Sequence, residues 1–131
     1  MKNNYEQLKE MFTEMVVKKN ASLIPKYYHP DFLLYSNGKI MDFDEMVRMH
    51  EDIYKTEIQY KVEYDEDISL EQDDKVAVRM YITTSRPDDA EKELELMLIA
   101  QYLDGKIYRV WELTFPDWSQ DKKFQESLDK L

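Results

Sequence analysis

The chain has 131 residues, a formal net charge of −10 and no cysteine. Its length is typical of one domain, here residues 1–131, with a core over about 5–116 and a tail over 117–131. The acidic charge repels phosphate groups, so we expect no nucleic acid and no anionic membrane as partners. Without cysteine there is no disulfide framework or thiol nucleophile. No stretch approaches the ~20 apolar residues of a membrane span and no signal-peptide core is present, so we expect a cytoplasmic protein.

The first part of the chain predicts three helices and one short hairpin. Apolar residues at spacings of three and four indicate the helices, and Asn3 or Asn4 is a suitable cap for the first. Asp42 and Glu45 have the spacing of a capping box and start the third helix. The expected elements are, in order, a helix over 4–18, a helix over 21–28, strands over 32–36 and 39–41, and a helix over 43–54.

From Glu57 the apolar period changes to two, which indicates strands. The strongest signal is Asp104-Gly105 between two long apolar runs, because both central residues of a type I′ hairpin turn need a positive φ. The expected elements are strands over 57–64, 68–70, 76–83, 93–103 and 107–115, a polar loop over 85–89, and a helix over 119–131.

Helices that precede a mostly antiparallel sheet predict an α+β fold. We expect the three N-terminal helices to pack on a curved sheet that closes into a cone, with a short C-terminal helix. The open end of a cone is a natural pocket. The strand from Glu93 to Leu103 is apolar on both faces over 96–99, so we also expect a homodimer through the outer face of the sheet.

Three segments of the sequence carry a resemblance to a known family. They are Tyr27–Phe32 ahead of a short strand, Lys75–Arg79 on a long strand, and Asp104–Ile107 followed by Trp111 and Glu112 on the last strand. With the order of the elements, they resemble the nuclear-transport-factor-2-like (NTF2-like) superfamily and its SnoaL-like and ketosteroid-isomerase-like branch. The resemblance implies a cystatin-like cone. This fold hosts isomerases, dehydratases, polyketide cyclases and non-catalytic binding domains, so it does not fix an activity.

The sequence departs from two catalytic patterns of that superfamily. Ketosteroid isomerases have a general-base aspartate on the first short strand, where this chain has Leu33–Ser36 and no acid. Tyr35 occupies the matching region and could donate a hydrogen bond to an oxyanion, or it could be a wall residue. Epoxide hydrolases of this fold use Arg-x-Asp, where this chain has Arg79-Met80-Tyr81.

Glu112 and His50 are the two candidates for moving a proton. Alternation along the last strand places Glu112 on one face with Tyr108, Val110 and Thr114, and Ile107 on the other. In an apolar cone, desolvation would raise the pKa of Glu112 and suit it to acid–base catalysis. His50 falls on the apolar face of the third predicted helix, where an imidazole could shuttle protons. The alternatives are an ion-paired surface carboxylate and a structural core histidine.

Arg79, Tyr81, Trp111 and Tyr108 are the candidates for ligand contacts. If Arg79 points inward, it would hold a carboxylate or an enolate; if outward, it would pair with an acid such as Glu95 on the neighbouring strand. We expect no metal site and no cofactor. Two ligands in one turn, as at His29 and Asp31, are too few for a metal, and a chain with two glycines has no glycine-rich phosphate loop.

These patterns predict a protein that binds a hydrophobic small molecule in the cone. It could be a cofactor-independent isomerase, cyclase or dehydratase acting by proton transfer on a carbonyl or hydroxyl compound. The alternative is a non-catalytic ligand carrier or a dimeric interaction domain. Catalysis requires that two titratable groups converge on one point of the cavity, whereas a carrier needs only an apolar cavity.

Overall fold

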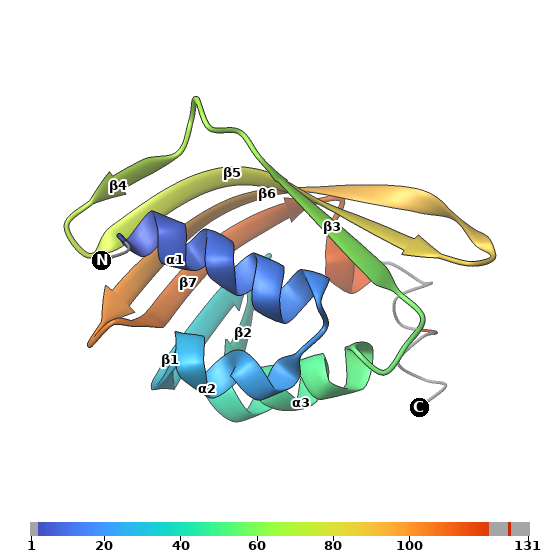
Figure 1. The fold of residues 1–131 in the computed structure, drawn as a ribbon, viewed down its shortest axis with the longest axis horizontal. Coiled ribbons are helices and arrows are strands. Elements are labelled where there is room, and N and C mark those ends of the chain that lie inside the picture. The colour runs from blue at the N-terminus through green and yellow to red at the C-terminus, as the bar shows by residue number, and fades with distance from the viewer. Residues whose placement is uncertain (1–2, 121–125, 127–131) are drawn as a thin grey trace.

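A computed structural model describes residues 3–120 and residue 126, and it has the predicted α+β architecture. Six strands are ordered β2-β1-β7-β6-β5-β3, and a seventh, β4, also pairs with β5 (Figure 1). Neighbouring strands are antiparallel, except that β1 and β7 are parallel. The strands are β1 (Tyr28–Ser36), β2 (Lys39–Asp42), β3 (Gln59–Tyr64), β4 (Leu70–Gln72), β5 (Lys75–Arg86), β6 (Asp89–Leu103) and β7 (Lys106–Phe115).

The helices lie where the caps in the sequence predict them. The Asn3 side chain accepts a hydrogen bond of 2.8 Å from the Glu6 N–H, and Asp42 and Glu45 form the expected capping box. The first helix continues past α1 as a π-helical segment, η1. The helical segments are α1 (Asn4–Met11), η1 (Phe12–Val17), η2 (Ala21–Leu23), α2 (Ile24–Tyr27), α3 (Phe43–Ile53) and η3 (Trp118–Gln120).

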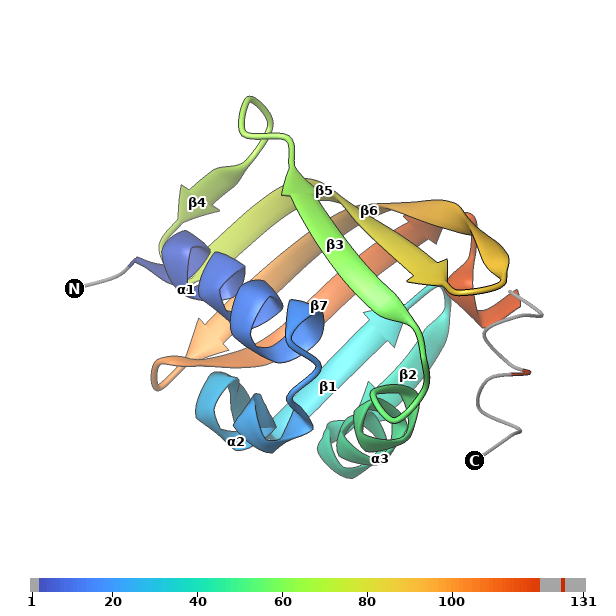
Figure 2. The ribbon, with the colours of Figure 1, turned by 45° about the vertical axis from the view of Figure 1, so that its right-hand side comes forward.

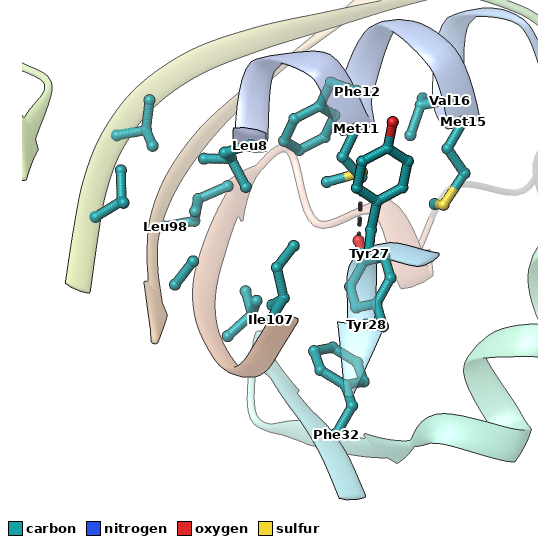
Figure 3. Packing of buried hydrophobic residues seen from close by; sticks show 14 of the residues in the cluster. Leu8, Met11, Phe12, Met15, Val16, Tyr27, Tyr28, Phe32, Leu98 and Ile107 are labelled. Atoms are coloured by element: carbon teal, nitrogen blue, oxygen red, sulfur yellow. Dashed lines mark hydrogen bonds between the residues drawn. The ribbon is translucent and has the colours of Figure 1, made fainter. Parts of the chain in front are cut away.

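The curved sheet and α1 enclose the core. Figures 1 and 2 show α1 lying across the hollow face of the sheet, with α2 and α3 beside β1 and β2. Side chains of α1 and η1, such as Leu8 and Met15, are buried against inward-facing residues of the sheet such as Leu98 (Figure 3). The Tyr28 hydroxyl lies 3.5 Å from the Met11 sulfur in this core. Helix and sheet are thus held together by apolar burial, the largest favourable contribution to folding.

Two hairpins differ in how well the sequence predicts them. At the β6–β7 turn, Asp104 and Gly105 have φ angles of 55° and 76°, as a type I′ turn requires. The loop expected over 85–89 is wrong, because β5 continues to Arg86 and β6 begins at Asp89, which pairs with it. A two-residue turn replaces the loop, with proline first, and proline's fixed φ suits that position of a tight turn.

A bulge in β7 changes which side chains face inward. Tyr102 pairs with Ile107 and Gln101 pairs with Arg109, so Tyr108 is an extra residue on this strand. Ile107 consequently faces the core, where it is 1% exposed. The alternation expected along this strand is therefore wrong at Ile107, which lies on the same side as Glu112.

The chain beyond β7 is described only in part. A short helical turn, η3, follows the strand, and the C-terminal helix expected over 119–131 lies almost entirely outside the described residues. Within residues 3–120, none of the helices has the length and apolar character needed to cross a bilayer.

Candidate functional site

The hollow side of the sheet contains a cavity of about 510 Å³. Its walls come from α1, η1, α3 and the inner faces of β1, β3, β5, β6 and β7. Most of the lining is apolar, as in Met11, Phe32 and Leu96. A small number of polar side chains placed in an apolar wall is typical of sites for small organic molecules. The polar and ionisable residues that matter below are Glu112, His50, Tyr54, Thr84, Arg86 and Lys92.

Glu112 lies on the inner face of β7 and is enclosed by protein. The Ser36 hydroxyl of β1 donates a hydrogen bond of 2.9 Å to Oε2 of Glu112, and the Trp118 indole N–H donates one of 2.9 Å to Ser36 Oγ. Burial raises the pKa of Glu112 above its ordinary 4.5, and the hydrogen bond from Ser36 partly opposes that rise because it favours the ionised form. The carboxyl group is thus fixed in place and biased toward holding a proton.

His50 lies on α3 and lines the same cavity. Its Nδ1 is 2.8 Å from the Met46 carbonyl oxygen, which can only accept, so Nδ1 carries the hydrogen. In the neutral ring Nε2 is then the acceptor. Burial lowers the pKa of His50 from its ordinary 6.5, so this neutral form predominates at pH 7. The structure therefore brings both candidate proton carriers to one cavity.

Tyr54, at the end of α3, was not among the residues that the sequence singled out. Its ring packs edge-on against His50, with ring centroids 5.4 Å apart. Its hydroxyl is buried, has no hydrogen-bond partner, and belongs to a residue that lines the cavity. Burial raises the pKa of Tyr54, so the hydroxyl keeps its proton and remains a donor. A buried hydroxyl without a partner is a ready donor for a ligand oxygen.

Tyr35 and Trp111 lie on the outer face of the sheet. They are partners in the parallel β1–β7 pair, and their rings stack with an interplanar angle of 7° and centroids 6.0 Å apart. Alternation along β1 turns Phe32 and Leu34 toward the cavity and Tyr35 away from it. Neither Tyr35 nor Trp111 lines the cavity, so the oxyanion and ligand contacts suggested for them have no geometric support here.

Arg79, Tyr81 and Tyr108 also lie outside the cavity. Arg79 takes the outward alternative, with hydrogen-bonded ion pairs of 2.8 Å to Asp65 and 2.6 Å to Glu95. Its guanidinium also lies 5.1 Å from the centroid of the Tyr81 ring. Tyr108 is the bulge residue of β7. None of the four ligand-contact candidates therefore reaches the inner wall.

Sequence reasoning missed several residues of the inner wall besides Tyr54. Thr84 and Arg86 continue the inward face of β5 beyond Ile82, and Lys92 continues that of β6 beyond Leu94. The signal was present, since the same period of two extends through these residues once the loop over 85–89 is read as strand. Among the described residues, no three His, Asp or Glu side chains are grouped so that they could hold a metal ion.

No protein-family model matches the chain, and no curated protein matches it. Solved structures do match. AclR of Streptomyces galilaeus, a proposed hydroxylase, is 20% identical, with 97% of this chain and 96% of that chain covered and a TM-score of 0.66. IdmH of Streptomyces antibioticus, a proposed polyketide cyclase, is 12% identical. The match covers 97% of this chain and 98% of IdmH, with a TM-score of 0.67.

A third similar structure is a proposed SnoaL-like polyketide cyclase from Jannaschia sp. CCS1. It is 12% identical, with 85% of this chain and 84% of that chain covered and a TM-score of 0.64. At such low identity these likenesses concern the fold. They confirm the fold expected from the sequence, which is the α+β cone of NTF2-like proteins.

Proposed function

We propose that this protein binds a hydrophobic carbonyl or hydroxyl compound in the cavity and catalyses a proton transfer on it without a cofactor. The observation that carries the proposal is Glu112, a carboxyl group enclosed in an apolar cavity, held by Ser36 and with a raised pKa. Active sites are where burial shifts the pKa of a carboxyl toward the working pH.

Glu112 would act as the general base. As a carboxylate it removes a proton from the carbon next to the ligand's carbonyl group, and the raised pKa strengthens it as a base. Negative charge then develops on the carbonyl oxygen. The unpartnered Tyr54 hydroxyl would donate a hydrogen bond to that oxygen, the role that the sequence suggested for Tyr35.

The fate of the proton decides the reaction type. Return of the proton from Glu112 to another carbon gives an isomerisation, and attack of the carbanion on a second carbonyl gives an aldol cyclisation. Loss of a hydroxyl group as water gives a dehydration. In the last two cases Nε2 of neutral His50 would take the proton from Glu112 and pass it to the new alkoxide or to the departing hydroxyl group. All three reactions use the same base and need no cofactor.

The rival proposal is a non-catalytic ligand carrier or dimeric interaction domain. The predominantly apolar lining of the cavity supports a carrier. The outer face of β6 and β7 supports a homodimer, because it exposes large apolar side chains that a second copy could cover. These residues are Met97, Ile99, Trp111, Leu113 and Phe115.

Hydrogen exchange at carbon separates the enzyme from the carrier. The protein would be incubated in heavy water with hydrophobic ketones such as cyclodecanone and β-tetralone, and deuterium next to the carbonyl would be followed by NMR. We expect exchange above background that falls by roughly 10²–10⁴-fold in Glu112→Gln. Glu93→Gln, on the exposed outer side of β6, is the matched control. Ketone binding without exchange would establish the carrier.

A further inference from the structure

The chain that follows β7 forms part of the cavity wall. Thr114 lies on the same face of β7 as Glu112, two residues further along, and both line the cavity. Asp117 and Trp118, in the chain beyond the strand, line it as well. The segment 114–118 therefore belongs to the same site as the Glu112 carboxyl group.

Asn37, in the turn between β1 and β2, holds the start of this segment. Its Oδ1 accepts a hydrogen bond of 2.9 Å from the Thr114 N–H, and its Nδ2 donates one of 2.7 Å to Thr114 Oγ1 and one of 3.1 Å to Asp117 Oδ1. Asn37 has a φ of 50°, a left-handed conformation that asparagine adopts more readily than most residues. The residue that suits the turn therefore also fixes the chain that follows β7.

Ser36, the neighbour of Asn37, holds both the end of the segment and Glu112. Its Oγ accepts a hydrogen bond of 2.9 Å from the Trp118 indole N–H and donates one of 2.9 Å to Glu112 Oε2. A hydroxyl group has one hydrogen, so the indole N–H directs that hydrogen away from the indole and toward the carboxyl group. Hydrogen bonds in series also polarise one another. Trp118 thus strengthens, through Ser36, the bond that holds Glu112.

The contact between Trp118 and Ser36 should depend on the charge of Glu112. A hydrogen bond to a carboxylate is roughly twice as strong as one to a neutral carboxyl group, and polarisation along the series acts in both directions. If Trp118 favours the ionised form of Glu112, that form must favour the Trp118 contact by the same factor. The segment 114–118 is therefore held most firmly when Glu112 is ready to remove a proton.

We propose that Trp118 is a positioning residue for Glu112, which acts through Ser36 to fix the carboxylate for proton removal and to hold the cavity wall in place while the carboxylate is ionised. This inference rests on the proposed function, in which Glu112 is the general base. It adds how the protein prepares that base.

The other ionisable groups near Glu112 must be separated from it in any test. Burial raises the pKa of Tyr28 on β1 well above its ordinary value, so Tyr28 stays neutral. Hydrogen bonds within its own turn and, more weakly, the charge of Lys39 on β2 lower the pKa of Asp117, so Asp117 stays ionised. Below pH 6.5 the titration of His50 on α3 can overlap that of Glu112, so the test includes a variant without the imidazole.

The indole N–H resonances make the coupling observable without a ligand. The chain has two tryptophans, and Trp111 is exposed outside the cavity, so Trp111→Phe identifies the Trp118 resonance in isotopically labelled protein. We expect this resonance to shift with pH at the same midpoint as the Glu112 carboxyl carbon. The shift should disappear in Glu112→Gln and persist in His50→Gln. A Trp118 resonance that does not titrate, or that titrates equally in Glu112→Gln, would overturn the inference.

Trp118→Phe keeps an aromatic ring and removes the N–H. The midpoint of Glu112 should rise, because the Ser36 hydroxyl loses the donor that polarises it, and the acid limb of the rate of exchange into β-tetralone should move to higher pH with it. At high pH we expect kcat to fall roughly tenfold while KM changes less than about twofold. Trp111→Phe should change none of these. A lower melting temperature with an unchanged midpoint and kcat would mean that Trp118 only packs, and the inference would be refuted.

The outcomes separate this inference from the function on which it rests. Exchange at the wild-type kcat in Trp118→Phe would refute the positioning role and leave the enzyme. A Trp118 resonance that titrates with Glu112, in a protein that exchanges no ketone, would support the coupling and refute the proposed function. Should Trp118→Phe fail to fold, the titrations of wild type, Glu112→Gln and His50→Gln decide the matter, because they leave Trp118 in place.

Discussion

Ser36 and Glu112 face each other across the parallel pair of strands β1 and β7, and their side chains are hydrogen-bonded over 2.9 Å. Ser36 is 2% exposed, and the Trp118 indole N–H donates to its oxygen. The hydroxyl hydrogen of Ser36 is thereby directed at Glu112 Oε2. Oε2 of the carboxyl group is thus held by the protein.

Removal of the Ser36 hydroxyl should therefore weaken the fold and disturb Glu112. In Ser36→Ala the carboxyl loses its donor and the indole loses its acceptor, which should lower the free energy of unfolding by about 1–3 kcal/mol. Urea denaturation at pH 7 measures this. Ser36→Thr keeps the hydroxyl and should recover most of the loss. Equal stability of Ser36→Ala and the wild type would mean that the hydrogen bond does not hold Glu112 in solution.

Glu112→Gln should stabilise the protein while reducing its activity. In the folded protein the pKa of Glu112 is raised above the unfolded value of 4.5. The stability that the protonated carboxyl group contributes is therefore fully present below pH 4.5 and is lost as the pH rises through the folded pKa. Gln cannot ionise and is spared that loss. The gain in melting temperature of Glu112→Gln over wild type should thus be absent at pH 4 and present at pH 8. A gain that does not depend on pH would contradict the raised pKa.

His50 should make the fold sensitive to acid. In the folded protein the pKa of His50 is lowered below the unfolded value of 6.5. The stability that the neutral imidazole contributes is therefore present above pH 6.5. It is lost as the pH falls toward the folded pKa, because the unfolded chain binds the proton more readily. His50→Gln should lose less stability than wild type between pH 7 and pH 5 in urea titrations. His29→Gln is the control, since His29 does not line the cavity. If wild type and His50→Gln lose the same stability in acid, protonation of His50 does not lower the free energy of unfolding, and the lowered pKa would be refuted.

The proposed homodimer should depend on the outer face of β6 and β7. Leu113 and Phe115 are 66% and 78% exposed, and a lysine at either position would put a charge into the apolar interface. We expect Leu113→Lys to weaken self-association by roughly 2 kcal/mol, measured by sedimentation equilibrium. Ile40→Lys, on the exposed side of β2, should have no effect. Wild type that remains a monomer at high concentration would refute the dimer.

Periodicity in the sequence predicted the fold well because most elements obey it. Asp104-Gly105 defined the β6–β7 hairpin, and the capping residues Asp42 and Glu45 defined α3. Periodicity also placed His50 on the apolar face of α3 but left open which face of the sheet carries Glu112, and the structure places both residues at one cavity.

The residues that were misplaced lie where periodicity breaks or is ambiguous. The bulge at Tyr108 reverses which side chains at the start of β7 point inward. No pattern in the sequence predicts a single inserted residue of this kind. Tyr35 was suggested by analogy with another protein's active site, and the alternation along β1 turns it outward. Arg86 was missed because its polar neighbours resemble a loop. Which polar groups face a shared cavity depends on the curvature of the sheet, and that curvature is a property of the assembled strands.

The titration of the Glu112 carboxyl carbon, followed by NMR on selectively labelled protein, tests the account most directly. A carboxyl group enclosed in a dry cavity should titrate with a midpoint above 4.5, and the midpoint should rise further in Ser36→Ala, which lacks the hydrogen bond that favours the ionised form. A midpoint at or below 4.5 that Ser36→Ala leaves unchanged would show that water reaches Glu112 freely, and the proposed chemistry would be refuted.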